Sequence, residues 1–123
     1  MRYVMLIYET PADFASRALT ESEPYIAAWR AYHRALVAAG AYVAGAPLKA
    51  ASTATTIRTK GGLRHVQDGP FAESKDQLGG IAIVDFESLD AALDWAARCP
   101  AAATGAVEVR PMDVSYLEIV ARA

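Results

Sequence analysis

The sequence predicts an α+β fold, a ferredoxin-like βαββαβ sandwich with a β-hairpin inserted in its middle. Two segments have the apolar spacing of amphipathic helices, and runs of β-forming residues flank each of them. Two further β-like runs on either side of Lys60-Gly61-Gly62 predict the hairpin. The 123 residues have a globular composition, 54% hydrophobic and 21% charged, and we expect a single domain over residues 1–123.

The N-terminal half is predicted to contain two strands and one long helix. Residues 2–8 are rich in β-formers and predict a buried strand, whereas residues 9–19 read as a loop. A helix is expected to begin at the capping box Thr20-x-x-Glu23, with Pro24 in its first turn, and to end at Gly40. A short strand at 41–45 follows and ends before Pro47. The apolar stripe of the helix contains Ile26, Trp29, Leu36 and Val37, and His33 lies on the same stripe.

The C-terminal half is predicted to contain the hairpin, a second helix and three strands. The hairpin strands are expected at 53–59 and 63–67, and a continuous apolar run predicts a strand at 80–86. Ser88 is a suitable N-cap for a helix over 89–98. Residues 101–103 read as a surface loop, and strands are expected at 105–110 and 114–120. The apolar positions of the second helix are Leu89, Ala92, Leu93, Ala96 and Ala97.

The segment Asp68-Gly69-Pro70-Phe71-Ala72-Glu73-Ser74-Lys75 has more chemically active side chains than a connector needs. Gly69 permits a positive φ and Pro70 fixes φ near −65°, so the chain must bend there. An ionisable residue before the bend and an aromatic one after it suit a ligand site. They also suit an ordinary turn in which Asp68 accepts hydrogen bonds from nearby amides.

This segment closely resembles the signature of the YCII-related proteins, in particular their DGPF subgroup. The resemblance implies a dimeric α+β barrel, in which two sheets close face to face in a homodimer. A second sheet is needed because the two helices can shield only one face of the first sheet from water. Other features similar to the family are the opening strand at 3–8, Ala44-Gly45, the helix around 91–96, the run Gln77-Leu78-Gly79-Gly80 and the near-terminal residues 107–111.

The resemblance also implies a difference in one site residue. Smaller YCII-related proteins look as though they carry a His-Asp pair, with the histidine on the first helix. Counting back from Gly40 places the corresponding position near Trp29 in this sequence. An indole cannot transfer a proton. Either His33, one turn further on, takes over the role, or this subgroup uses its cleft for different chemistry, and the Asp of the signature need not be the same Asp.

Asp68 is the first candidate for acid/base catalysis, because burial at the end of a strand would raise the pKa of a carboxyl group toward neutrality. The competing interpretation is a turn-stabilising carboxylate. His65 lies in the strand before the bend, three residues from Asp68 and therefore on the opposite face. His33 would look toward the sheet from the first helix, as a catalytic partner or as an ordinary core histidine.

Further residues are candidates for binding a substrate rather than for catalysis. Glu73 and Lys75 either orient an anionic or carbonyl group beside Asp68 or form a solvated turn face. Tyr8 and Phe71 are expected in the core or in a pocket wall. With Trp29, Gly69 and Pro70 these four residues complete the expected substrate site.

Composition and spacing argue against several functions. A net charge of −2 without a basic block argues against nucleic-acid binding. The opening apolar run is too short for a membrane span or a signal peptide, so a cytoplasmic location is expected. Gly79-Gly80 lacks the spacing of a dinucleotide fingerprint, and neither a metal site nor a cofactor is expected. Cys99, the single cysteine, is expected to be a small buried residue or to lie at a helix end.

Two functions remain open at this point. The resemblance implies a small cofactor-independent enzyme that transfers protons on a cyclic or aromatic molecule, with Asp68 as the acid/base, His33 or His65 as its partner and Lys75 stabilising an enolate-like charge. The alternative is a non-catalytic homodimer that binds a metabolite or another protein. DGPF-type proteins are often associated with extracytoplasmic-function sigma factors, which implies a regulatory role by analogy.

Overall fold

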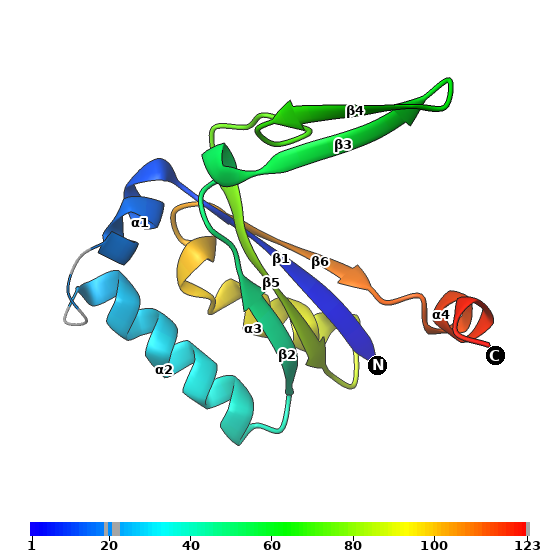
Figure 1. The fold of residues 1–123 in the computed structure, drawn as a ribbon. Helices are drawn as coiled ribbons and strands as arrows, with labels where there is room; N and C mark the ends of the chain where they lie inside the picture. Colours follow the sequence, from blue (N-terminus) through cyan, green and yellow to red (C-terminus); the bar gives the residue numbers. More distant parts are fainter. Residues whose placement is uncertain (19, 21–22, 123) are drawn as a thin grey trace.

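The computed structural model describes residues 1–18, 20 and 23–122 (Figure 1). Three short 3-10 turns, Ser16–Ala18, Ala51–Thr53 and Pro100–Ala102, join larger elements. Within the described residues no helix is long and apolar enough to cross a membrane. The larger elements are β1 (Arg2–Glu9), α1 (Pro11–Ala15), α2 (Pro24–Ala38), β2 (Tyr42–Pro47), β3 (Thr55–Lys60), β4 (Leu63–Asp68), β5 (Gln77–Asp85), α3 (Leu89–Ala97), β6 (Ala106–Pro111) and α4 (Val114–Val120).

The predicted ferredoxin-like fold with its inserted hairpin is confirmed. One sheet has the strand order β2-β5-β1-β6, and its neighbouring strands are all antiparallel. α2 and α3 lie on the same side of this sheet, and β3 and β4 form a separate two-stranded sheet (Figure 1). The chain therefore has a covered face, where a core can form, and an open face.

The core lies between the four-stranded sheet and the helices. Alternate residues of β1 are buried, from Tyr3 through Met5 and Ile7 to Glu9, because successive side chains of a strand point to opposite faces. α2 contributes Tyr32 and Leu36, and α3 contributes Ala92 and Ala96. Each large apolar side chain buried in this way stabilises the fold by about 2–3 kcal/mol. The same alternation carries a carboxylate, that of Glu9, into the covered layer.

The open face of the sheet is also apolar. Leu6 pairs with Ile81 and Val4 with Ile83, and these four side chains are only partly shielded or exposed. The β3–β4 hairpin and α4 both extend away from the sheet on the side opposite α2 (Figure 1). A single chain thus leaves one sheet face and two projecting elements uncovered.

Several expected turns and caps are confirmed. Gly61 and Gly62 have φ values of 57° and 77°, as the tight hairpin between β3 and β4 requires. The Ser88 side chain accepts a hydrogen bond from Ala91 N at 3.1 Å and so caps α3. Gly40, with φ 69°, follows the end of α2 in the left-handed region, a position typical of a helix-ending glycine.

Two predicted elements were wrong in type. The expected loop at 9–19 contains α1, whose N-cap Thr10 accepts a hydrogen bond from Asp13 N at 3.1 Å. The expected strand at 114–120 is helix α4, because Asp113 caps it by accepting a hydrogen bond from Tyr116 N at 2.9 Å. In both places a local side-chain cap outweighs the β-forming or loop-like composition.

Other expectations fail in detail. The N-cap of α2 is Glu23 rather than Thr20, and its carboxylate accepts hydrogen bonds from Tyr25 N and Ile26 N. Ala101 is fully buried, so residues 101–103 do not form a simple surface loop. Four residues expected on the buried stripes, Val37, Leu89, Leu93 and Ala97, are exposed.

Candidate functional site

A cavity of about 490 Å³ lies between α2 and the covered face of the sheet. It extends along α2 from Tyr25 in the first turn to Leu36 in the last turn. This volume is within the range of pockets that bind small molecules. Its walls are mainly apolar and aromatic: Met5, Ile7, Ile26, Trp29, Tyr32, Leu36, Tyr42, Pro47 and Ala82.

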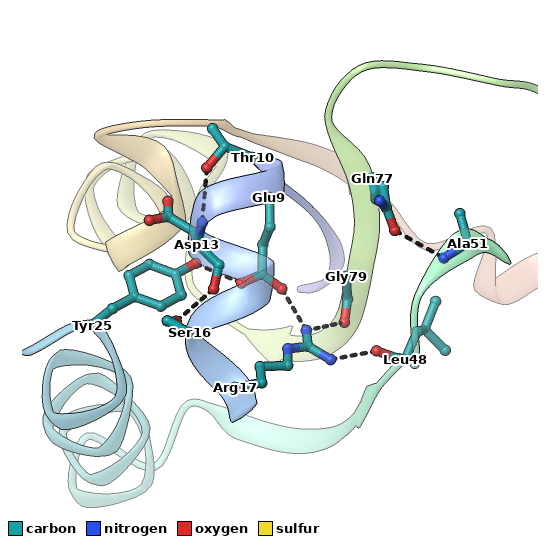
Figure 2. Close-up of polar contacts among 10 residues, drawn as sticks. All are labelled: Glu9, Thr10, Asp13, Ser16, Arg17, Tyr25, Leu48, Ala51, Gln77 and Gly79. Atoms are coloured by element: carbon teal, nitrogen blue, oxygen red, sulfur yellow. Dashed lines mark hydrogen bonds and ion pairs between the residues drawn. The ribbon is translucent and has the colours of Figure 1, made fainter. Parts of the chain in front are cut away.

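Glu9 places a buried carboxylate at the end of this cavity near the first turn of α2. Its side chain is 3% exposed, and both carboxylate oxygens have partners. Arg17 Nη2 donates to Oε1 at 2.5 Å, and the Tyr25 hydroxyl donates to Oε2 at 2.6 Å (Figure 2). A buried carboxylate needs such partners because desolvation disfavours its charge. The arrangement therefore places a buried Glu9–Arg17 pair against an apolar hollow.

Arg17 connects this carboxylate to two neighbouring strand segments. Its guanidinium donates from Nη2 to Gly79 O at 2.9 Å and from Nη1 to Leu48 O (Figure 2). Leu48 N in turn donates to Gly79 O at 2.8 Å. Arg17 reaches this position because the Ser16–Ala18 turn continues α1, where Ser16 Oγ donates to Asp13 O at 2.5 Å. The sequence analysis predicted a loop here, but the helical turn Ser16–Ala18 is what places the Arg17 guanidinium beside Glu9.

A β-bulge makes room for the Glu9–Arg17 pair. Ile7 pairs with Gly80 and Tyr8 with Leu78, which leaves Gly79 as the extra residue of β5. A Cβ atom at residue 79 would lie 2.8 Å from Glu9 Cδ, nearer still to Oε1, and 3.0 Å from Arg17 Nη2. Only glycine leaves this space free. Gly79 is therefore the position where the ion pair approaches the backbone of β5 closely.

Burial and the Glu9 hydrogen bond also act on Tyr25. Desolvation, and then the bond to the Glu9 carboxylate, raise the pKa of the Tyr25 hydroxyl far above its ordinary value of 10.0. Desolvation likewise raises the pKa of Tyr32, whose hydroxyl donates to Trp95 O at 2.8 Å. Both phenols are hydrogen-bond donors at neutral pH, and neither is a ready acid.

Two of the predicted site residues line the cavity. Trp29 contacts Tyr25 and Tyr32 edge to face, with ring centroids 6.3 and 5.9 Å apart, so it forms part of an aromatic wall. His33 lies one turn further along α2, and its ring meets that of Tyr42 at 4.7 Å. The His33 side chain is exposed, which places it at the rim of the cavity.

Asp68 does not line this cavity, contrary to the expectation of a carboxylate buried beside the long helix. It ends β4 as an exposed residue, in the hairpin that extends away from the sheet (Figure 1). The bend after it is held by Gly69 N, which donates to Ala54 O at 2.7 Å, and by Thr56 Oγ1, which donates to Gly69 O at 2.8 Å. Gly69 has the positive φ expected of it, 99°. The catalytic role of Asp68 stays a prediction.

His65 is exposed as well, and it lies on the other face of the hairpin. It pairs with Arg58, whereas Asp68 pairs with Thr55, and residues directly opposite in an antiparallel pair share a face. The structure therefore brings neither histidine to Asp68 within one chain.

Part of the signature loop borders a second, shallower hollow. Lys75 lines it together with Tyr8, Asp13 and Thr104. Glu73 is exposed in the same loop, Gly69 and Pro70 are half-buried at the bend, and Phe71 is 75% exposed. The expectation that Phe71 packs into a core or pocket wall was wrong: its ring lies 5.6 Å from the Arg58 guanidinium carbon on the projecting hairpin.

Comparisons with known proteins agree with the fold. Residues 1–113 match the YCII-related domain. The chain belongs to this family. An uncharacterised protein of Rhizobium meliloti (strain 1021) is 38% identical over 114 residues, covering 91% of this chain and 92% of that protein. A solved structure of 5-chloro-2-hydroxyhydroquinone dehydrochlorinase from Burkholderia phenoliruptrix AC1100, in complex with 2,5-dihydroxybenzoquinone, is 20% identical with a TM-score of 0.53, covering 92% of this chain and 94% of that one.

In this YCII-related chain the sequence prediction missed the polar group of the cavity. Glu9, Arg17 and Tyr25 were not among the expected site residues, although one signal was available. Buried residues of β1 are the odd-numbered ones, and continuing that alternation by one step places Glu9 on the buried face. Arg17 has no such signal, because the segment that carries it was read as a loop.

Proposed function

We propose that this YCII-related protein is a cofactor-independent enzyme that performs acid/base chemistry on a small cyclic or aromatic molecule, and that it works as a homodimer. The cavity between α2 and the sheet is the observation that carries the proposal. Its volume of about 490 Å³ suits one or two rings, its walls are largely apolar and aromatic, and one buried carboxylate paired with Arg17 lies at its end. The dehydrochlorinase with a similar fold binds a ring-shaped quinone, which supports the same substrate class.

The proposed roles of the ionisable side chains follow from the contacts that each of them makes. Both oxygens of Glu9 already accept a hydrogen bond, so its proposed role is to shape the electrostatic potential at the end of the cavity, and no proton transfer is assigned to it. His33 at the rim is the proposed proton-transfer group of the cavity, since imidazole changes its charge near neutral pH. Asp68 is the proposed second acid/base residue; Lys75 in the loop after it and His65 on the opposite face of the same hairpin are proposed as further contributors.

The motif from Asp68 to Lys75 supports a finer assignment within the family, to its DGPF subgroup. The homodimer is supported by the uncovered apolar face of the four-stranded sheet, where Leu6 pairs with Ile81. Closure of two such faces would remove both from water and form the dimeric barrel expected of the fold.

A second candidate function is a non-catalytic module that binds a metabolite in the same cavity. The pairing of both Glu9 oxygens with Arg17 and Tyr25 favours it, because a carboxylate held in this way is not free to transfer a proton. This reading needs no contribution from Asp68 or His65, which lie outside the cavity of a single chain.

Ligand binding tests the site that both readings share. Thermal-shift and NMR screening of small ring compounds, with 2,5-dihydroxybenzoquinone as the first probe, should yield a ligand that stabilises the native state. Arg30→Trp should weaken binding at least tenfold, since Arg30 lines the cavity. Arg34→Trp is the matched control: Arg34 is also exposed on α2 and does not line the cavity. Equal binding by both variants would place the ligand elsewhere.

Turnover separates the enzyme from the binding module. For a compound that binds and reacts, His33→Gln and Asp68→Asn should each lower kcat by about 100-fold or more while binding persists, the usual effect of losing an acid/base group. Full retention of turnover in both variants would contradict the proposed chemistry. The absence of any reaction for every bound ring compound would support the non-catalytic module.

A further inference from the structure

Several polar side chains that line the cavity under α2 already have partners within the chain. Glu9 accepts hydrogen bonds from Arg17 and Tyr25, so the two charges of the ion pair offset one another at that end of the cavity (Figure 2). The Tyr32 hydroxyl donates to Trp95 O at 2.8 Å. A ligand would have to compete with these bonds, so its own polar group must find other partners.

Three further polar side chains of the cavity wall are free to be those partners. In the part of the chain that the structure describes, the side chains of Arg30, His33 and Tyr42 make no hydrogen bond or ion pair, and all three line the cavity. Arg30 and His33 are neighbours on one face of α2, three residues apart, and both are exposed at the rim. A guanidinium, an imidazole and a phenol hydroxyl can all donate hydrogen bonds. A ligand group that accepts hydrogen bonds therefore fits this rim.

The charge at this rim is positive. α2 contains Arg30, His33 and Arg34 and no acidic residue, so no carboxylate of the same helix neutralises Arg30. Glu9 is the one acidic side chain among the described residues that line the cavity, and it is paired with Arg17. The Arg30 guanidinium thus stands without a counter-ion at the mouth of a mainly apolar hollow, where charge attraction is stronger than in bulk water. The electrostatic complement of this rim is an anion.

A β-bulge and a glycine in β2 determine where Tyr42 lies. Tyr42 pairs with Val84, whereas Gly45 pairs with Ala82. The register shift between these two pairs brings Tyr42 and Gly45, three residues apart, to the covered face of the sheet. A Cβ atom at residue 45 would lie 2.7 Å from the Tyr42 hydroxyl oxygen and 3.4 Å from Cε2 of its ring. The bulge and the glycine thus place the phenol ring beside His33, with centroids 4.7 Å apart, and its hydroxyl over Gly45.

We infer that the cavity takes a small ring compound that carries a carboxylate, with the ring between α2 and the sheet and the carboxylate at the rim, held by Arg30 and the Tyr42 hydroxyl. The inference rests on the proposed function and names the substrate class of that site. A carboxylate held there brings the adjoining carbon atoms of the ligand near His33, the proposed proton-transfer group. The opposite end of the cavity holds Glu9, whose charge disfavours a second carboxylate, so the orientation of the ligand is fixed as well.

Binding of two matched ring compounds tests the charge preference. 1-Naphthoate and 1-naphthamide have nearly the same shape, but only the first is negatively charged near neutral pH. By titration calorimetry the parent protein should bind naphthoate about tenfold more tightly, the scale of one hydrogen bond to a charged group. Arg30→Gln should remove most of this difference, whereas Arg34→Gln, on the same helix but outside the cavity, should keep it. Added salt should weaken naphthoate binding and leave naphthamide binding unchanged.

Tyr42 is tested by a separate pair of variants. Tyr42→Phe should weaken naphthoate binding about tenfold and naphthamide binding by less, because a hydrogen bond to a charged acceptor is the stronger one. Tyr116→Phe is the control, since this phenol lies on α4 and does not line the cavity. Gly45→Ala, whose methyl group would displace the Tyr42 hydroxyl, should reproduce the Tyr42→Phe effect on binding.

The outcomes separate this inference from the proposed function. Equal affinity for the two compounds, a preference that survives Arg30→Gln, or no binding of naphthoate would overturn the inference. The proposed function would still be decided by the screen of ring compounds and by turnover in His33→Gln. Arg30-dependent binding of naphthoate without turnover of any ring carboxylate would instead contradict the proposed enzyme and leave the inference intact.

Discussion

The Glu9 carboxylate fills the space in which a side chain of residue 79 would stand. A Cβ atom at Gly79 would lie 2.8 Å from Glu9 Cδ, so the β-bulge and the glycine are both required for the buried ion pair. The bulge also turns the Gly79 carbonyl toward Arg17. Backbone geometry and electrostatics therefore depend on one another at the polar end of the cavity.

Gly79→Ala should destabilise the fold by about 3 kcal/mol, because the added methyl group displaces a buried carboxylate from its cation. Urea unfolding measures this loss. Gly80→Ala is the matched control, since its Cβ would lie 3.1 Å from Ala46 O and touches no charged group. We expect about 1 kcal/mol there. Similar losses of unfolding free energy in both variants would show that the Glu9–Arg17 pair can move away from the added methyl group without destabilising the fold.

Glu9→Gln should cost about 2 kcal/mol, because it leaves the Arg17 guanidinium without its counter-charge while keeping the shape of the side chain. The figure is moderate because Arg17 is 31% exposed and partly solvated. Tyr25→Phe removes a hydrogen bond and leaves the ion pair, so about 1 kcal/mol is expected. In the double variant the losses should be less than additive, since both substitutions act on one carboxylate. Strict additivity in urea unfolding would argue against a shared network.

The order of strands and long helices could be predicted from the sequence because it depends on local patterns. Runs of β-forming and apolar residues predicted the sheet, the Lys60-Gly61-Gly62 turn predicted the hairpin, and Ser88 predicted the start of α3. α1 and α4 were missed because each is short and owes its helical state to one capping side chain, Thr10 or Asp113. Such caps are common in loops too, so composition alone does not single them out.

The candidate site was predictable only in part, because its polar group is assembled from distant segments. His33 and Trp29 lie on a helix whose apolar spacing aims them at the sheet, and both line the cavity. Glu9, Arg17 and Gly79 meet only after β1, α1 and β5 are in place. Asp68 belongs to a hairpin that leaves the body of the chain, so its surroundings depend on whatever packs there.

Cys99 should make stability fall in alkaline solution. Burial raises the pKa of its thiol from 9.0 to about 11, so the folded state holds a proton that the unfolded state loses. This contribution is fully present below pH 9 and is lost as the pH rises through 11, on the order of 2–3 kcal/mol. Urea unfolding of the parent and of Cys99→Ala between pH 8 and 11 measures the Cys99 contribution. Tyr25 and Tyr32 are present in both proteins, so their effect on the pH dependence of stability cancels in the comparison. Parallel pH profiles would contradict the assignment.

Asp113 should make helix α4 sensitive to acid. Hydrogen bonds from Tyr116 N and then from the Ser115 hydroxyl lower the pKa of this carboxyl below its ordinary value of 3.8. Its support for the helix is therefore present above pH 3.8 and is lost as the pH falls through the lowered pKa. Amide exchange at Tyr116 should accelerate over that range in the parent protein. Asp113→Asn keeps an N-cap that does not titrate, so its exchange should lack this acid step, whereas Asp113→Ala should exchange fast at every pH. A step that persists in Asp113→Asn would assign the acid sensitivity to another group.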